Sequence, residues 1–408
     1  MSVVSIEEIS LDKYSSIVGE GKIEAIKALA DNLAGKSVCH VNSTSFGGGV
    51  AEILYRLVPL MRNVGLKAEW RVIKGSDEFF NVTKAIHNGL QGMNISLTDQ
   101  MKKTYLEYNE MNAKELDLRH EFVVIHDYQP AAIISQYKVR VGKWVWRCHI
   151  DLSNPNPDFI NFITPVIYQY DSLIFTMEQY VQEPLRAKKV AIIRPSIDPL
   201  SAKNKPLPED LIRSVLNKYD VDAEKPVITQ VSRFDPWKDP LGVIDVYRMV
   251  KKGIPNLQLL LIASMAKDDP EGWTYYEKTA RHAAEDYDIH LLTDMKGVGD
   301  IEVNAFQRAS NVILQKSIRE GFGLSVTEAL WKEVPVVGGN VGGIPLQIVH
   351  GENGFLVNSV KEAAEKTLYL LKHPIEAKKM GMKGKEHVLK NFLITRHLED
   401  YLKLFNSL

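Results

Sequence analysis

The stretch SVCHVNSTSFGGGVAEILYRLVPLM, residues 37–61, decides the fold because it holds three structural patterns in succession. Its first five residues, SVCHV, form an apolar stretch with two valines, which predicts a buried strand over SVCHVN. VAEILYRLVPLM repeats apolar residues at helical spacing. The glycines in between, Gly47, Gly48 and Gly49, predict a tight turn where the backbone can approach a ligand. A strand, a glycine turn and a helix in this order begin a βαβ unit.

The same alternation continues along the chain. Strand-like runs separated by helical patterns lie at residues 68–73, 122–127, 143–150, 172–177 and 189–195, and again at 226–234, 257–264, 288–294, 311–317 and 334–340. Strands separated by helices form parallel sheets with helices on both faces. We therefore expect an α/β protein with doubly wound, Rossmann-like domains.

The length of 408 residues predicts two domains, since single cores stop growing at about 250–300 residues. The stretch PSIDPLSAKNKPLPED, residues 195–210, holds four prolines and few apolar residues, which is typical of a linker. We expect one Rossmann-like domain at 1–195, a second at 196–390, and a C-terminal helix at 391–408 that could return to the first domain. Ligands bind beyond the carboxyl ends of parallel strands, so the two domains should face each other across a cleft.

The composition argues against several classes of partner. The net charge is −1, from 50 basic and 51 acidic residues, so neither a nucleic acid nor an anionic membrane is favoured. The N-terminus lacks a basic region followed by an apolar core, and no apolar run is long enough to span a bilayer. We expect a cytoplasmic protein whose two cysteines, Cys39 and Cys148, are small buried hydrophobes.

The glycine triplet does not fit a dinucleotide site. Gly47-x-Gly49 is followed by Val50-Ala51-Glu52, so the third glycine of the dinucleotide motif is missing. The next strand-like run ends at Lys74, where a nicotinamide site would hold an acidic residue for the ribose. Two interpretations stay open: a turn that needs positive φ, and a close contact with another ligand.

Two later motifs point to an anion and a sugar. In SRFDPWKDP (232–240), Arg233 and Lys238 could converge on a diphosphate, although a solvated surface pair is the alternative. In IREGFGLSVTEALW (318–331), two glycines flank Phe322 where a helix begins, so its amides can approach an anion. Glu320 would suit sugar hydroxyls there. Glu328 has a structural alternative, a capping box with Ser325.

Together with GGNVGGIPLQIVHGENGFLV (338–357), these motifs resemble the retaining glycosyltransferases of family GT4, which have the GT-B fold of two facing Rossmann-like domains. The stretches EFFNVTKAIHNGLQG (78–92), HDYQP (126–130) and WRCHIDLSNPN (146–156) are similar to the trehalose glycosyltransferring synthases of archaea and bacteria. That resemblance implies transfer of glucose from a nucleoside-diphosphate glucose to free glucose, forming trehalose or cleaving it in reverse. Fungal-type trehalose phosphorylases share these stretches, so phosphorolysis is an alternative, as is a non-catalytic nucleotide-sugar-binding protein.

The resemblance also implies which residues bind the donor. Arg233 and Lys238 would hold its diphosphate and stabilise the leaving group, Glu320 would bind the glucose hydroxyls, and Glu328 the ribose. His149 would line the glucose near its anomeric face; without the resemblance, a structural histidine at a strand end is the simpler interpretation. Backbone contacts to the donor are implied for Gly48, Gly49, Gly321, Phe322, Gly323 and Leu324.

Four residues of the first half are implied for the acceptor glucose: Asp127, Tyr128, Asp151 and His87. His87 could equally lie in the core or on the surface. The family's reaction is a front-face attack in which the departing diphosphate deprotonates the acceptor, without a protein nucleophile. The resemblance implies no required cofactor or metal site, although Mg²⁺ can accompany the diphosphate. The partners are therefore small molecules, and a homodimer stays open.

Overall fold

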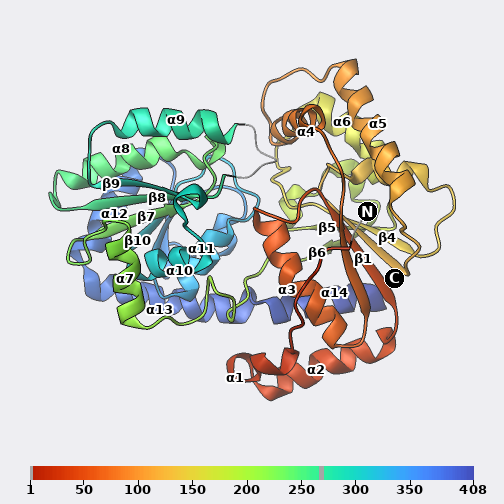
Figure 1. Ribbon diagram of the computed structural model, residues 1–408, viewed down its shortest axis with the longest axis horizontal. Coiled ribbons are helices and arrows are strands. Elements are labelled where there is room, and N and C mark those ends of the chain that lie inside the picture. Colours follow the sequence, from red (N-terminus) through yellow and green to blue (C-terminus); the bar gives the residue numbers. More distant parts are fainter. Residues whose placement is uncertain (1–2, 266–270) are drawn as a thin grey trace. The chain divides into compact units, whose positions relative to one another are not determined.

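The computed structural model describes residues 3–265 and 271–408. These residues form two compact units, each with its own six-stranded sheet (Figure 1). Unit 1 comprises the chain up to Ser196 together with Ile394–Leu408, and unit 2 comprises Ile197–Leu393. Each unit is described by itself.

The sheet of unit 1 is parallel throughout, in the order β2-β1-β3-β4-β5-β6. Its strands are β1 (Ser37–Asn42), β2 (Lys67–Val72), β3 (Phe122–His126), β4 (Lys143–Arg147), β5 (Ser172–Phe175) and β6 (Lys189–Ile192). Its helices are α1 (Ser15–Val18), α2 (Glu20–Ala30), α3 (Gly49–Asn63), α4 (Asp77–Leu90), α5 (Asp99–Glu115), α6 (Pro157–Ile167) and α14 (Ile394–Asn406). Short 3-10 turns lie at Leu11–Tyr14, Asp31–Leu33, Ala131–Gln136, Glu178–Tyr180 and Glu183–Leu185.

Alternate residues of these strands pack on opposite faces of the sheet. One face belongs to a large core that includes Val123, Ile125 and Trp146 and residues of α4, α5 and α6. On the other face α14 packs with α2 and α3, and Phe122 of β3 stacks on Phe405 of α14. The last residues of the chain thus complete the first unit.

The sheet of unit 2 is also parallel, in the order β12-β11-β10-β7-β8-β9. Its strands are β7 (Val227–Val231), β8 (Gln258–Ala263), β9 (Ile289–Thr293), β10 (Val312–Gln315), β11 (Val336–Gly339) and β12 (Gly354–Val357). Its helices are α7 (Glu209–Lys218), α8 (Pro240–Lys251), α9 (Gly272–Ala283), α10 (Asp300–Ala309), α11 (Leu324–Trp331), α12 (Val360–Lys372) and α13 (Pro374–Asn391), with 3-10 turns at Pro236–Lys238, Asp294–Lys296 and Ile344–Leu346. Two separate cores form: α8, α9 and α12 contribute to one, and α7 and α10 to the other; Figure 1 shows α8 and α9 on one side of the sheet and α7 and α10 on the other.

The doubly wound α/β fold predicted from the alternating pattern is confirmed. The expected strands agree with the observed ones to within three residues at each end, and the largest differences are that β4, β6 and β7 end at Arg147, Ile192 and Val231, three residues earlier than expected. Strand β12 was not predicted. Its four residues, GFLV, lie in a glycine-rich run, and no helical pattern separates them from the preceding strand-like run. Both cysteines are free and buried, as expected.

The proline-rich segment at 195–210 contains the sequence boundary between the two units, at Ser196 and Ile197, and its first part is buried. Ser196, Asp198 and Asn204 are buried. The side chain of Asn204 donates to the carbonyl of Asp198 at 3.1 Å and accepts from Lys332 Nζ at 2.8 Å. The first part of the segment, up to Asn204, is therefore tied to the end of α11, whereas most of residues 205–210 are exposed. In the described part of the chain, no helix has both the length and the apolarity needed to cross a membrane.

Candidate active site

The loop after β7 carries Arg233 and Lys238, and two aspartates fix its shape. Asp235 accepts hydrogen bonds from the backbone N–H groups of Trp237 (2.9 Å) and Lys238 (3.1 Å). Asp239 adopts the left-handed conformation with φ of 51° and caps α8 by accepting from Gly242 N at 3.1 Å. Aspartate tolerates this conformation better than most residues, so the loop holds a defined turn.

The loop after β10 carries Glu320 and leads into α11. Gly323 caps that helix with φ of 85°, and a Cβ added there would lie 3.2 Å from Glu320 Cγ. Only glycine combines this backbone conformation with so little room. Glu320 is 6% exposed, and Ser317 Oγ donates to its Oε2 at 3.1 Å.

The two loops meet at Lys238 and Glu320. Lys238 Nζ lies 2.8 Å from Glu320 Oε1 and 2.7 Å from Oε2. The backbone supports this contact, since Trp237 O accepts from Ile318 N at 2.7 Å. The structure thus brings two of the predicted catalytic side chains together at the carboxyl ends of β7 and β10, the edge where parallel sheets bind ligands.

Arg233 lies in the same loop with more of its side chain in water. Its Nη2 is 3.7 Å from Asp235 Oδ2, and the side chain is 35% exposed, against 16% for Lys238. Lys238 is therefore not a solvated surface lysine. Arg233 is partly exposed, and a guanidinium can bind a diphosphate through two parallel hydrogen bonds.

Glu328 lies in α11 and is 1% exposed. Gln307 Nε2 donates to its Oε2 at 3.2 Å, and Lys203 Nζ lies 3.4 Å from its Oε1. Burial alone would raise the pKa of this carboxyl, but the charges of Lys203 and Lys332 outweigh it and the pKa is lowered. The carboxylate therefore stays charged inside the protein.

The capping box that was the structural alternative for Glu328 is not formed. Residue Gly323, which has no side chain, is the N-cap of α11, and Ser325 Oγ donates to Gln315 Oε1 at 3.2 Å instead. The helix begins at Leu324, two residues too early in the sequence for Ser325 to act as its cap. The Lys203 contact had no sequence signal, because it comes from the segment interpreted as a linker.

In unit 1, the glycine triplet lies between β1 and α3. Gly47 and Gly48 have φ of 74° and 85°, and Gly49 is the first residue of α3. Positive φ thus explains two of the three glycines. A Cβ added at Gly48 would meet no described atom within 4 Å, so the backbone conformation alone requires glycine there.

His149 follows β4 and is the end of a row of three imidazoles. His126 Nδ1 lies 2.9 Å from His149 Nε2, and His126 Nε2 lies 2.9 Å from His40 Nδ1. His40 and His126 are buried in β1 and β3, whereas His149 is partly exposed. Sequence reasoning singled out His149 and missed the other two; histidines near the carboxyl ends of two adjacent parallel strands were the available signal.

Asp127 follows β3 with φ of 61°, in the left-handed region. Its Oδ1 accepts from His149 N at 2.6 Å, which ties the two predicted site residues together. Burial raises the pKa of Asp127 to about 7, and this backbone hydrogen bond and the charge of Arg147 oppose the rise. The folded protein therefore favours the protonated form of this carboxyl more than water does.

The other three predicted acceptor residues come from three elements: Tyr128 follows Asp127 after β3, His87 lies on α4, and Asp151 lies in the loop after β4. Tyr128 is buried, and its ring centroid lies 5.7 Å from that of His87 on α4. His87 is partly exposed, with its Nε2 2.6 Å from the side-chain amide of Gln91. Asp151 is buried and accepts from Ser153 N at 2.8 Å and Ser153 Oγ at 2.5 Å, so it shapes its own loop.

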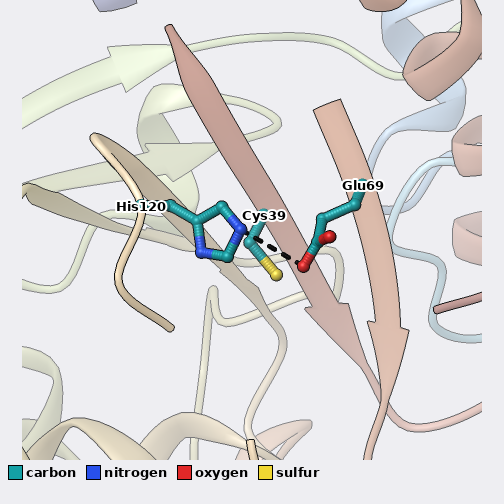
Figure 2. A group of neighbouring side chains, drawn as sticks. All are labelled: Cys39, Glu69 and His120. Atoms are coloured by element: carbon teal, nitrogen blue, oxygen red, sulfur yellow. Dashed lines mark ion pairs between the residues drawn. The ribbon is translucent and has the colours of Figure 1, made fainter. Parts of the chain in front are cut away.

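Three side chains of types that bind metals gather elsewhere in unit 1. Figure 2 shows Cys39 of β1, Glu69 of β2 and His120 with one possible ligand atom each within 4.8 Å of the others. His120 Nε2 lies 3.2 Å from Glu69 Oε1, and Arg71 Nε lies 2.5 Å from the same oxygen. The guanidinium places a permanent positive charge where a cation would bind, so we assign no metal to this cluster.

Comparison with protein families gives matches to both halves of the chain. Residues 40–182 match the family described as "Trehalose synthase, N-terminal domain", and residues 213–387 match "Glycosyl transferases group 1". The trehalose synthase of Thermococcus litoralis is 60% identical over 399 residues, which cover 97% of each chain. That of Rubrobacter xylanophilus is 49% identical over 98% of this chain and 97% of its own.

More distant proteins share part of the sequence or the fold alone. The trehalose phosphorylase of Pleurotus pulmonarius is 29% identical over 85% of this chain, which spans 54% of the phosphorylase. The E. coli trehalose-6-phosphate structure bound with UDP-2-fluoro glucose has a TM-score of 0.73 at 14% identity, covering 91% of this chain and 99% of its own. The sucrose-phosphate synthase of Thermosynechococcus elongatus has a TM-score of 0.72 at 16% identity, covering 91% and 98%. These structures share the fold of this chain.

Proposed function

The chain belongs to the trehalose synthase family of glycosyltransferases, and from this premise we propose that it transfers glucose from a nucleoside-diphosphate glucose to free glucose, forming trehalose. Trehalose synthesis is the activity named for the relatives that match nearly the whole chain. The same catalyst can run the reaction backwards when a nucleoside diphosphate and trehalose are supplied. The nucleoside-diphosphate donor is the part of the proposal that goes beyond the family match.

The contact between Lys238 and Glu320 is the observation that carries this proposal. It holds one cation and one carboxylate together at the carboxyl edge of the unit 2 sheet. A nucleoside-diphosphate sugar needs both charges, because the diphosphate requires a cation and the glucose hydroxyls require acceptors. Arg233, exposed in the same loop, adds a second cation for the diphosphate.

The start of α11 supplies further donor contacts in the proposal. The amides of Gly321, Phe322 and Leu324 lie where the positive end of the helix dipole favours an anion or an electronegative sugar oxygen. Glu328, charged and buried in the same helix, is assigned to the ribose. Its two oxygens already accept from Gln307 and contact Lys203, and a carboxylate has lone pairs for further donors.

In unit 1 we assign Asp127, Tyr128, Asp151 and His87 to the acceptor glucose, and His149 to a sugar hydroxyl. Gly48 and Gly49 are exposed, and a Cβ at Gly48 would meet no described atom within 4 Å. The rate enhancement would come from positioning and from stabilising the charge that builds on the leaving diphosphate. The proposal assigns no residue as a nucleophile and no protein metal site; Mg²⁺ can accompany the diphosphate as part of the substrate.

The proposal is tested by incubating the protein with glucose and either UDP-glucose or ADP-glucose. We expect trehalose and the free nucleoside diphosphate in equal amounts, with the α configuration of the donor retained in the product. Glucose 1-phosphate with glucose should give no product. Trehalose from glucose 1-phosphate and none from either nucleotide sugar would assign the phosphorylase reaction instead.

A further inference from the structure

The row of imidazoles in unit 1 is a continuous chain across adjacent strands. His40 of β1 contacts His126 of β3, which contacts His149 after β4, with 2.9 Å between nitrogens at both links. The rings of each pair are stacked with centroids 5.2 Å apart. Every ring nitrogen of the central residue, His126, is therefore engaged by another histidine.

The two ends of the chain differ in their exposure. His40 is 0% exposed, and no described residue accepts from or donates to its Nε2. His149 is partly exposed, and its Nδ1 is the ring nitrogen that the chain does not use. The chain is therefore closed at His40 and open at His149.

Neutral imidazoles in such a chain have coupled tautomers. Each link needs one proton, so if His40 carries its proton on Nδ1, His126 must carry it on Nδ1, and so must His149. The opposite direction would bury an N–H of His40 without an acceptor. Orphaned buried N–H groups are rare, so the outward direction is favoured.

The groups around the three histidines oppose the addition of a proton that would make one of the imidazoles positively charged. Charged and titratable groups from β4, the loop after β3 and α14 face it: Arg147, Asp127, Arg396, His397 and Tyr401. Arg147 is directly opposite His126 in the strand register, and none of its guanidinium nitrogens has a hydrogen-bond partner among the described residues. Burial lowers the pKa of His40 to about 3, and burial with nearby positive charge holds the pKa of His126 and His149 well below the ordinary range.

We propose that His40 and His126 are positioning residues that hold His149 neutral with its proton on Nδ1, so that His149 donates a hydrogen bond to a substrate hydroxyl. The substrate part of this statement rests on the proposed function. The chain acts through hydrogen bonds alone and transfers no net proton. The proposal also gives a role to Arg147, whose guanidinium has no hydrogen-bond partner among the described residues. Its positive charge makes protonation of the three imidazoles unfavourable.

The test uses the full chain with ¹⁵N-labelled histidine, whose ring nitrogens report their protonation in two-bond ¹H–¹⁵N correlation spectra. The protein has eleven histidines, and single His→Gln variants assign the signals of His40, His126 and His149. At pH 7 we expect His40, His126 and His149 all to be neutral with Nδ1 protonated. His149 protonated on Nε2, or doubly protonated, in the unsubstituted protein would overturn the proposal.

Two matched substitutions at His40 test the coupling. His40→Asn keeps an amide where Nδ1 lies, whereas His40→Leu removes the link. We expect His149 to keep its tautomer in His40→Asn and to populate both tautomers in His40→Leu, with kcat reduced on the order of tenfold in the latter and KM changed less. An unchanged His149 spectrum in folded His40→Leu would contradict the proposal.

Arg147→Met provides a further variant, which leaves all three histidines unchanged. Removing the positive charge should raise the pH at which His126 and His149 become protonated, as seen in the same spectra. Unchanged titration would contradict the role given to Arg147. The spectra need no turnover. The expected tautomers in a protein that makes no trehalose would refute the proposed function and the substrate part of this inference, and would leave the tautomer part standing.

Discussion

Lys238 donates to both carboxylate oxygens of Glu320, at 2.8 and 2.7 Å, although the residues are 82 positions apart in the chain. The pair joins the loops that follow β7 and β10. Because the ammonium and the carboxylate already neutralise each other, an incoming diphosphate would compete with Glu320 for Lys238. In this arrangement Glu320 holds the ammonium group of Lys238 at the proposed position of the leaving diphosphate.

Lys238→Ala should lower turnover by about a thousandfold, because a preorganised positive charge at the leaving group is lost. The protein should stay folded, with lower stability since Glu320 loses the partner of a largely buried pair. Initial rates and thermal unfolding measure the two effects. The matched control is Lys251→Ala, which breaks ion pairs with Asp286 and Asp288 at the end of α8. Near-normal turnover in Lys238→Ala would remove the diphosphate assignment.

Glu320→Gln should separate sugar binding from nucleotide binding. The amide keeps the size of the side chain but loses the charge that holds Lys238, so the lysine becomes available to the diphosphate. We expect turnover to fall by about a hundredfold or more, while calorimetry shows unchanged or tighter binding of a nucleoside diphosphate. Much weaker diphosphate binding would show that Glu320 supports the phosphate site rather than the sugar.

Gly48→Ala tests whether the glycine turn is needed for more than its backbone conformation. Gly19 is a close match, since it has φ of 86° and ψ of 148° against 85° and 157° at Gly48, caps α2 as Gly48 caps α3, and also has room for a Cβ. Both variants should lose about 1–3 kcal/mol of stability from backbone strain. Only Gly48→Ala should also lose activity. Equal activity in the two variants would reduce Gly48 to a structural role.

Asp127→Asn tests the raised pKa of this carboxyl. A folded-state pKa of about 7 means that the folded protein favours the protonated form, so the contribution of Asp127 to stability is greatest below the ordinary pKa of an aspartate, near 4, and is lost as the pH rises through 7. The variant should therefore gain stability relative to the unsubstituted protein between pH 4 and pH 7, by up to about 4 kcal/mol. Asparagine tolerates the positive φ of this position. Parallel stability curves, measured by urea unfolding at several pH values, would refute the shift.

The sequence was sufficient for eleven of the twelve strands, all except β12, because buried parallel strands are continuous apolar runs between helical patterns. It also placed Lys238 and Glu320 in loops after strands, where ligands bind. Their direct contact was not predictable, since it depends on how two loops pack against each other. The capping box at Ser325 was wrong for a local reason: the helix begins at a glycine cap instead.

Other parts of the site depend on contacts distant in sequence. Glu328 is paired with Lys203, which comes from the proline-rich segment that was interpreted as a linker. The imidazole chain needs the register of β1, β3 and β4, and α14 covers it from the far end of the chain. Composition and spacing identify single residues such as His149, but the tertiary fold decides which partner each one has.

The nucleotide dependence of trehalose cleavage tests the central claim most directly. The protein is incubated with trehalose and, in separate reactions, UDP, ADP or inorganic phosphate, and released glucose is followed with time. We predict glucose release with a nucleoside diphosphate, accompanied by an equal amount of nucleoside-diphosphate glucose, and none with phosphate. Release with phosphate alone, or with none of the three, would contradict the account.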